Sequence, residues 1–367
     1  MRYRRVGDTE LYISEIGFGC GGNAGLMVRG ELRDQIRVVE RALALGVTYF
    51  DNAPDYGDGR AEQNLGRALR ELGVRQVINA QVADSPVTGS RVTNSTVTNS
   101  PVINSKVEIR AADLGDIAGH VVRSAEQSLT RLRIEHFDMF QVHNGPARSR
   151  PVPEGNAYRQ LWLEDFLRPG GACDGIMRLK NAGKIRHAGF ICRGDDADAV
   201  AALLDTGLFA LINVPYTLLN PTAGLRKPAG LPAKDFGNVI EIAERRAASA
   251  AIYSPLAGGL LTDALLKGAP PHPLARGRDT ASAATKLQRA QVARLAFLPD
   301  EGEGLAQVAY RFVLSNAGVA TVLGGFSAVE QVEELAAVSG RGPIAPDKMR
   351  RLEALWESNF EAELHPS

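Results

Sequence analysis

The sequence has few cysteines and no excess of charge of either sign. Its three cysteines, Cys20, Cys173 and Cys192, lie far apart in 367 residues and form no Cys-x-x-Cys or Cys/His pattern. We therefore expect no metal site and no disulfide framework, but reduced thiols in a cytoplasmic protein. The 42 basic residues balance the 42 acidic ones, which gives no electrostatic reason to expect a nucleic acid or an anionic membrane as partner.

Long apolar segments are also absent. No run is long enough to span a bilayer. Residues 1–17 contain several arginines but lack the apolar core of a secretory signal, so we expect no membrane association. A small molecule remains the expected partner, and homo-oligomerisation is left open.

Short apolar segments alternate with longer amphipathic ones along the whole chain. Eight segments have the near-continuous apolar character of buried parallel strands: residues 15–19, 48–51, 102–106, 137–143, 185–190, 211–215, 250–254 and 320–324. Helical patterns occur between and after them: residues 32–45, 61–72, 117–132, 200–204, 239–246, 304–314 and 329–335. This alternation predicts an α/β fold, a closed (β/α)8 TIM barrel that forms a single domain over residues 1–367.

A doubly wound parallel sheet is the alternative fold. It is disfavoured because no G-x-G-x-x-G turn opens a helix after the first strand, where the sequence reads GFGCGGN. Residues 3–6 and 11–13 predict an N-terminal β-hairpin before the first barrel strand. Residues 220–237 and 268–283 are rich in Gly and Pro, and we expect them to form long loops on the substrate face of the barrel.

A five-residue repeat interrupts the region before the third strand. Valine recurs at positions 77, 82, 87, 92, 97, 102 and 107, and Asn, Asp or Gly follows each of the first six valines by two places. A period of five fits neither a helix nor a strand. We interpret residues 77–106 as a tandem insertion within the barrel, either a polar low-complexity loop or a short β-solenoid coil.

The first and last copies of the repeat, VINAQV and VINSKV, are nearly the same strand, and only one can occupy the third position of the barrel. The choice places either Gln81 or Lys106 on that strand. We favour Lys106, because the chain continues normally from the last copy toward the next helix.

Three polar side chains lie at or just past the ends of predicted strands. Asp51 ends the second strand, Tyr56 follows it by five residues, and His143 ends the fourth. Taken singly, Asp51 is typical of a turn and His143 of a satisfied core histidine. Together they indicate an active site, because barrel enzymes build their sites at the carboxyl ends of the strands.

With these residues in place, the sequence resembles the aldo-keto reductase family over nearly the whole chain outside the repeat. It is most similar to the bacterial, potassium-channel-beta-like and sugar-dehydrogenase-like branches. The motifs that carry the resemblance are GFGCG (17–21), FDNAPDYGDGRAEQNLGRAL (50–69), SLTRLRIEHFDMFQVH (128–143), GKIRHAGF (183–190), INVPYTLLN (212–220), YSPLAGGLLT (253–262) and VLGGFSAVEQVEE (322–334).

The resemblance implies an NAD(P)-dependent oxidoreductase that transfers hydride between a nicotinamide and an aldehyde, ketone or sugar hydroxyl. Tyr56 would be the general acid and base. A free phenol has a pKa of about 10, and Lys106 would supply the cation that brings it toward neutrality. Asp51 would hold Lys106, and His143 would orient the substrate carbonyl.

The resemblance also implies a set of cofactor-binding residues. They are Gly19, Asn213, Tyr253, Ser254, Leu256, Gly258, Gly324, Gly325, Phe326, Gln331 and Glu334. The chain departs from the family at Ile191–Cys192, where a polar carboxamide contact is usual, and at Leu335, where an adenine-reading Asn is common. No basic residue stands where a 2′-phosphate is clamped, so NAD(H) is favoured over NADP(H). The alternative function is a cofactor-impaired barrel that acts as a binding or regulatory subunit.

Overall fold

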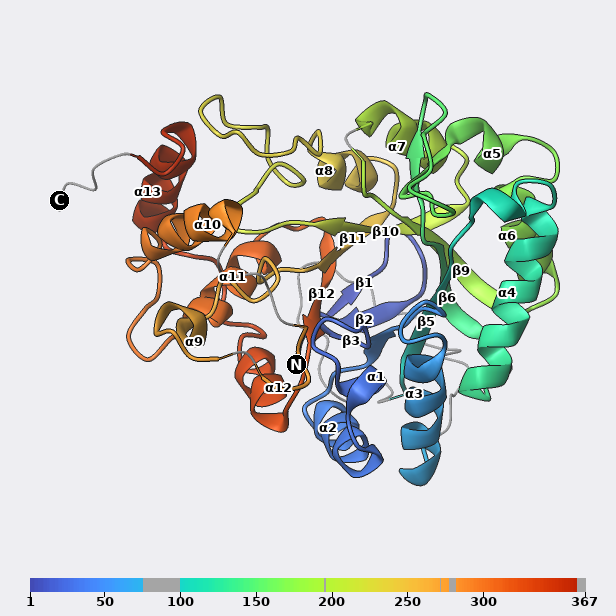
Figure 1. Cartoon of the computed structure of the whole chain (residues 1–367), viewed down its shortest axis with the longest axis horizontal. Coiled ribbons are helices and arrows are strands. Elements are labelled where there is room, and N and C mark those ends of the chain that lie inside the picture. Colours follow the sequence, from blue (N-terminus) through green and yellow to red (C-terminus); the bar gives the residue numbers. More distant parts are fainter. Residues whose placement is uncertain (75–99, 195, 271, 277–281, 362–367) are drawn as a thin grey trace.

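A computed structural model of the chain describes residues 1–74, 100–194, 196–270, 272–276 and 282–361. Its centre is a closed barrel of eight parallel strands (Figure 1). In order around the barrel the strands are β3 (Ile16–Gly19), β4 (Tyr49–Asp51), β5 (Val102–Val107), β6 (Phe137–Val142), β9 (Ile185–Ile191), β10 (Phe209–Pro215), β11 (Ser249–Tyr253) and β12 (Val319–Gly325). The predicted (β/α)8 barrel is confirmed, and because the sheet is closed the doubly wound alternative is wrong.

Helices surround the barrel on its outer side. They are α1 (Leu26–Arg29), α2 (Leu32–Ala44), α3 (Arg60–Glu71), α4 (Ile117–Leu132), α5 (Leu163–Leu167), α6 (Ala172–Asn181), α7 (Ala197–Leu204), α8 (Val239–Glu244), α9 (Asp263–Leu266), α10 (Ala283–Ala293), α11 (Leu305–Leu314), α12 (Val329–Ala336) and α13 (Pro346–Glu357), with a 3-10 turn at Ala111–Asp113. Each of the seven predicted helices corresponds to one of them. No helix within the described residues is long and apolar enough to cross a membrane.

The sequence prediction missed several of these helices and misplaced one helix start. Helices α1, α5, α6, α9, α10 and α13 were not predicted. Helix α7 begins at Ala197 rather than at residue 200, because the Asp196 side chain accepts a hydrogen bond from the backbone N–H of Ala199 and caps the helix there. The expected loop at 220–237 has no helix or strand, whereas the expected loop at 268–283 ends where α10 begins, and its residues 271 and 277–281 lie outside the described residues.

Two small sheets accompany the barrel. Strands β1 (Tyr3–Arg5) and β2 (Tyr12–Ser14) form the predicted N-terminal hairpin, and β7 (Gly145–Ala147) pairs with β8 (Gln160–Trp162) after β6. The hairpin segment places Val6, Leu11 and Ile13 in one buried cluster with the inward-facing side chains of the barrel strands. It therefore closes the N-terminal end of the barrel, and a ligand has to approach from the other end.

Alternation along the strands decides which side chains line the barrel interior. On β5, Val102 belongs to the inner cluster and Ile103 to the outer core that the helices cover. Because strand side chains alternate, Asn104 and Lys106 share the inward face with Val102. The same rule on β6 places Gln141 and His143 on the inward face with Met139. Apolar residues thus fill the hairpin end of the barrel, and polar residues gather at its open end.

The third barrel position is occupied by the last copy of the repeat. Strand β5 pairs in register with both neighbours, Tyr49 facing Val102 and Lys106 facing Gln141. The placement of VINSKV in the barrel is thus observed, and the competing placement of VINAQV is excluded. Gln81 and the rest of the repeat through residue 99 lie outside the described residues.

Gly66 allows a test of how closely helix α3 packs against helix α4. A methyl group at this position would lie 2.3 Å from the carbonyl oxygen of Leu132, on the neighbouring helix α4. We expect Gly66→Ala to lower the free energy of unfolding by about 2 kcal/mol, because backbone atoms have to move apart. Gly115→Ala, which meets nothing within 4 Å, should leave stability unchanged or raise it by up to about 1 kcal/mol. Urea unfolding of both variants checks this, and equal effects would contradict the close packing.

Candidate active site

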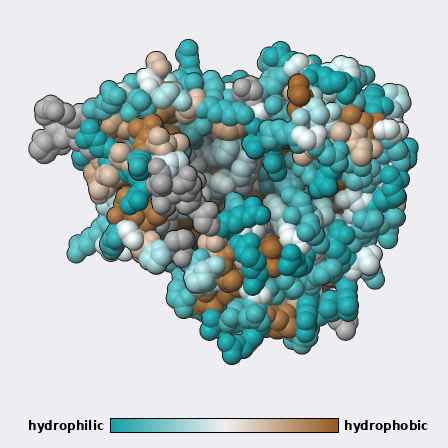
Figure 2. Space-filling model, in the orientation of Figure 1, coloured by the Kyte–Doolittle hydropathy of each residue, from teal (hydrophilic) through white to brown (hydrophobic). Residues whose placement is uncertain are grey.

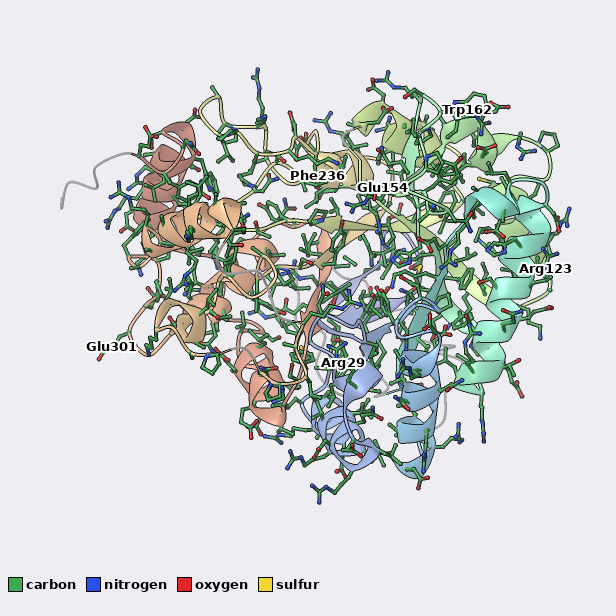
Figure 3. The ribbon with its side chains drawn as sticks, viewed as in Figure 1. Arg29, Arg123, Glu154, Trp162, Phe236 and Glu301 are labelled. Atoms are coloured by element: carbon green, nitrogen blue, oxygen red, sulfur yellow. The ribbon has the colours of Figure 1, made fainter. Side chains whose placement is uncertain are left out.

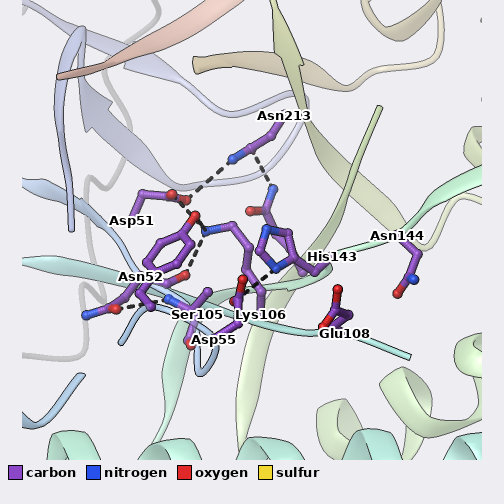
Figure 4. Close-up of polar contacts among 12 residues, drawn as sticks. Asp51, Asn52, Asp55, Ser105, Lys106, Glu108, His143, Asn144 and Asn213 are labelled. Atoms are coloured by element: carbon purple, nitrogen blue, oxygen red, sulfur yellow. Dashed lines mark hydrogen bonds and ion pairs between the residues drawn. The ribbon is translucent and has the colours of Figure 1, made fainter. Parts of the chain in front are cut away.

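A buried ion pair occupies the open end of the barrel (Figure 4). The ammonium of Lys106 on β5 lies 2.7 Å from Oδ2 of Asp51, which ends β4, and only 1% of the lysine side chain is exposed. Lys106 Nζ also donates to the backbone oxygen of Asn52 at 2.7 Å and to the hydroxyl of Tyr56 at 3.4 Å. The cation therefore joins a carboxylate and a phenol that are five residues apart in the sequence.

A ring of side-chain amides completes the coordination of Asp51. Its Oδ1 accepts from Nδ2 of Asn104 at 2.6 Å and from Nδ2 of Asn213, on β10, at 3.4 Å. Gln141 connects the two amides, accepting from Asn104 at 3.0 Å and donating to Oδ1 of Asn213 at 2.7 Å. These hydrogen bonds reach the buried carboxylate of Asp51 from several sides. A buried charge is stable only when it is paired and hydrogen-bonded in this way.

Tyr56 lies on the tight loop between β4 and α3. Left-handed backbone at Gly57, Asp58 and Gly59 turns the chain, and the N–H of Tyr56 donates to the oxygen of Ala53. Helix α3 then starts at Arg60. This geometry places the phenol ring 5.1 Å from Lys106 Nζ, measured to the ring centroid.

The environment of Tyr56 differs from the expectation in one respect. Burial, followed by the carboxylates of Asp51 and Asp55, raises the pKa of the phenol well above its usual value. The direction of this shift is opposite to the lowering expected from Lys106, which donates to the same hydroxyl. Tyr56 is therefore a protonated phenol across the physiological range and is suited to donate a proton.

His143 completes the group at the end of β6. Its imidazole packs edge-on against the ring of Tyr56, with centroids 6.0 Å apart, and its backbone N–H donates to Val107. The structure thus brings together all four residues expected to be catalytic: Asp51, Tyr56, Lys106 and His143.

A strained loop follows β11 on the same rim. Tyr253 ends this strand with its ring half-buried, and Ser254, Ala257 and Gly258 adopt left-handed backbone conformations around the partly buried Leu256. Loops with left-handed residues can turn backbone N–H groups toward an anion, and here the N–H groups of Ala257 and Gly259 are bonded within the loop, to the oxygens of Ser254 and Leu256. A flat ring beside an exposed, tightly turned loop fits the aromatic and pyrophosphate parts of a nicotinamide dinucleotide.

The end of β12 provides the other expected cofactor residues. Gly325 is exposed and pairs with Gly19 on β3, so the backbone is open to a ligand at this point. Phe326, in contrast, is buried and packs against Phe18 with centroids 5.1 Å apart; its ring also covers Gly324. The structure therefore places Phe326 in the core.

Helix α12 begins beside these glycines. The Gln331 side chain accepts a hydrogen bond from the backbone N–H of Ser327 at 2.7 Å, so it occupies a donor at the helix start. Glu330 adds a negative charge to the first turn. Further along, burial and the nearby Asp263 raise the pKa of Glu334, and Leu335 is buried in the core.

Some polar residues of the site were missed by the sequence reasoning. Asn104 and Gln141 are two positions from Lys106 and His143 on the same strands, so strand alternation alone could have assigned them to the site. Asp55 was also missed, because its contact with His143 joins the loop after β4 to the end of β6 and leaves no local signal in the sequence. Ile191 and Cys192, where the sequence departs from the family, are buried, apolar neighbours of Asn213.

Loops from several elements surround this end of the barrel. Figure 3 labels Arg29 of α1 on one side of the barrel and Glu154 and Phe236 on loops on the other. The face in view is mainly hydrophilic, with apolar side chains gathered in patches (Figure 2). Among the loop residues, Lys234 lies 5.5 Å from the ring of Phe236 and donates to the backbone oxygen of Arg193, just past β9. The mouth of the barrel thus includes cationic groups.

Comparison with known proteins identifies the family. The model of the aldo/keto reductase family matches residues 15–357. The chain is 24% identical to L-galactose dehydrogenase from Arabidopsis thaliana, covering 96% of the chain and 94% of the relative, and 25% identical to L-glyceraldehyde 3-phosphate reductase from Escherichia coli K12, covering 91% and 86%.

A solved structure supports the same fold. The holo form of aldo-keto reductase AKR11C1 from Bacillus halodurans superposes with a TM-score of 0.66 at 20% identity, covering 98% of this chain and 97% of that one. The barrel architecture and the family match agree over nearly the whole sequence. The chain therefore belongs to the aldo/keto reductase family.

Proposed function

We propose that the protein is a nicotinamide-dependent oxidoreductase that interconverts a carbonyl group, aldehyde or ketone, and the corresponding alcohol, including a sugar hydroxyl. The observation that carries the proposal is the contact of one buried ammonium with both Asp51 and Tyr56, at 2.7 and 3.4 Å. A barrel that only binds a partner has no need of a partly buried phenol held against a buried cation. The regulatory alternative is therefore not favoured.

The expected residue roles follow from the geometry. Tyr56, kept protonated by its surroundings, would donate its proton to the carbonyl oxygen and take it back in the reverse direction. Lys106 would stabilise the phenolate left after donation, and Asp51 would hold the ammonium in place. His143 would contact the same substrate oxygen from the other side.

The cofactor would be held on the rim between β11 and β12. Tyr253 would stack on the nicotinamide, the Ser254–Gly258 loop would bind the pyrophosphate, and Gly325 would allow the backbone to approach it. When bound, the nicotinamide supplies or accepts the hydride. Asn213 has one amide N–H directed to Asp51, which leaves its second N–H to bind the carboxamide.

The start of α12 supports NAD(H) over NADP(H). A 2′-phosphate at this point would have to displace Gln331 from the N–H of Ser327 and would lie near Glu330. No cation in the first turn of this helix compensates for that cost. The chemistry of substrates named for the relatives, L-galactose and L-glyceraldehyde 3-phosphate, places small hydroxylated carbonyl compounds first in a substrate screen.

Tyr56→Phe tests the proposed catalytic role. We expect kcat to fall by about 10²–10⁴-fold, because the proton donor is lost while the ring remains. The Kd for the dinucleotide should not change, since Tyr56 is assigned to the substrate. Steady-state kinetics and calorimetric titration separate these effects, with Tyr12→Phe on the N-terminal hairpin as control. Equal turnover in wild type and Tyr56→Phe would contradict the assignment.

Cofactor choice is tested by titrating the protein with NADH and NADPH. We expect NADH to bind at least about tenfold more tightly, since an unpaired phosphate near a carboxylate loses more than 1 kcal/mol. Gln331→Arg should raise the affinity for NADPH by adding a cation that pairs with phosphate, while NADH serves as the internal control. Tighter binding of NADPH by the wild type would overturn the preference. Absence of binding to either would favour the regulatory alternative.

A further inference from the structure

The residue before Tyr56 is an aspartate that faces the catalytic histidine. Oδ1 of Asp55 lies 3.2 Å from Nδ1 of His143, drawn as a dashed line in Figure 4. The imidazole side chain is 4% exposed and the carboxylate 33%. Nδ1 has no other partner, and the contact is an ion-pair distance rather than a well-aligned hydrogen bond.

Among the described residues, the other charged groups that influence the pKa of His143 are cations. Lys106 on β5 and Arg193 after β9 both disfavour a charged imidazole. Lys106 is itself paired with Asp51, whose oxygens are taken by the ammonium and the amide ring. Asp55, from the β4–α3 loop, is therefore the anion available to His143.

We propose that Asp55 is a positioning residue that fixes the imidazole of His143 with Nδ1–H toward its carboxylate and Nε2 toward the substrate oxygen. The inference rests on the proposed function and deepens it. Which ring nitrogen carries the proton is set by the partner of the other nitrogen. The carboxylate accepts only, so the nitrogen that faces it has to be the protonated one.

This arrangement gives His143 two states with opposite preferences. The neutral ring presents a lone pair on Nε2 and accepts a hydrogen bond from a substrate hydroxyl. The imidazolium carries a proton on Nε2 as well and donates a hydrogen bond to a carbonyl oxygen, while Asp55 balances its charge. Titration of one group thus converts the site from one that fits the alcohol to one that fits the carbonyl.

The direction of the pH dependence follows from the environment. Burial lowers the pKa of His143, and the contact with Asp55 opposes this only in part. The pKa of Asp55 is lowered, since burial is outweighed by His143 and Lys106, so the carboxylate is ionised at neutral pH. Glu108, at the end of β5, is bound to Arg110. Carbonyl reduction should therefore weaken as pH rises through the pKa of His143, which lies on the acid side of its ordinary value.

Asp55→Asn tests the positioning role, with Asp58→Asn as a matched control. Asp58 is an exposed carboxylate on the same loop, so its variant loses the same charge without touching His143. Ring ¹⁵N NMR of histidine-labelled protein reads the tautomer and pKa directly, and His143→Gln assigns the signal. The second readout is the pH profile of kcat/KM for carbonyl reduction.

We expect the wild type and Asp58→Asn to show the Nδ1–H tautomer and the same midpoint. In Asp55→Asn the tautomers should mix, and both the NMR pKa and the kinetic midpoint should move to lower pH. A shift of about one pH unit lowers kcat/KM about tenfold at any pH above both midpoints.

An Nε2–H tautomer in the wild type, or an unchanged His143 pKa in Asp55→Asn, would overturn the inference. The NMR experiment needs no turnover and so decides the role of Asp55 even in the absence of catalysis. Failure of the proposed function would show instead as no turnover with any nicotinamide and carbonyl pair.

Discussion

The ion pair between Asp51 and Lys106 is the interaction on which the site depends. Removal of one partner from a buried pair typically costs about 3–5 kcal/mol, because the remaining charge stays buried without compensation. Here the pair also joins adjacent barrel strands, β4 and β5, and the amides of Asn104 and Asn213 hold the carboxylate from the other side. The charged pair at the site therefore also helps to fix the pairing of β4 with β5.

Burial, followed by the negative charges of Asp51 and Asp55, keeps Tyr56 protonated beside an ammonium. Asp51, which pairs with Lys106, and Asp55 place two negative charges near the phenol. The ammonium of Lys106 contacts the hydroxyl of Tyr56 through the 3.4 Å hydrogen bond. It would stabilise the phenolate at the moment the proton leaves, when stabilisation is needed, without ionising the phenol beforehand.

The barrel could be predicted from the sequence because its strands are buried on both faces and so appear as short apolar runs. Asp51 and His143 were predictable in position, since they end such runs. Helix α6 was missed because its short amphipathic pattern, ACDGIMRLKN, lies in a stretch without a clear start signal. The contact between Asp55 and His143 could not be predicted, because it depends on how a loop after β4 approaches the end of β6.

The repeat poses a problem of register that the buried pair resolves. Six tandem copies have similar sequences, and only one of them can form the third barrel strand. If the register shifted by one copy, the strand would still contain a valine and mostly small or β-branched residues. The fifth residue differs along the copies: Gln81, Pro86, Arg91, Thr96, Pro101 and Lys106. This is the position that faces Asp51, so it decides which copy can occupy the barrel.

Each competing copy fails at that position for a physical reason. Proline removes a hydrogen bond from a barrel strand, which has no free edge. Glutamine and threonine would leave Asp51 as an unpaired buried charge. Arg91 keeps the charge, but its bulkier guanidinium would replace an ammonium that is almost completely enclosed. Its copy also carries Gly89 where Asn104 supplies an amide to Asp51 and Gln141. The copy that ends in Lys106 thus satisfies the buried carboxylate through both its third and its fifth residue.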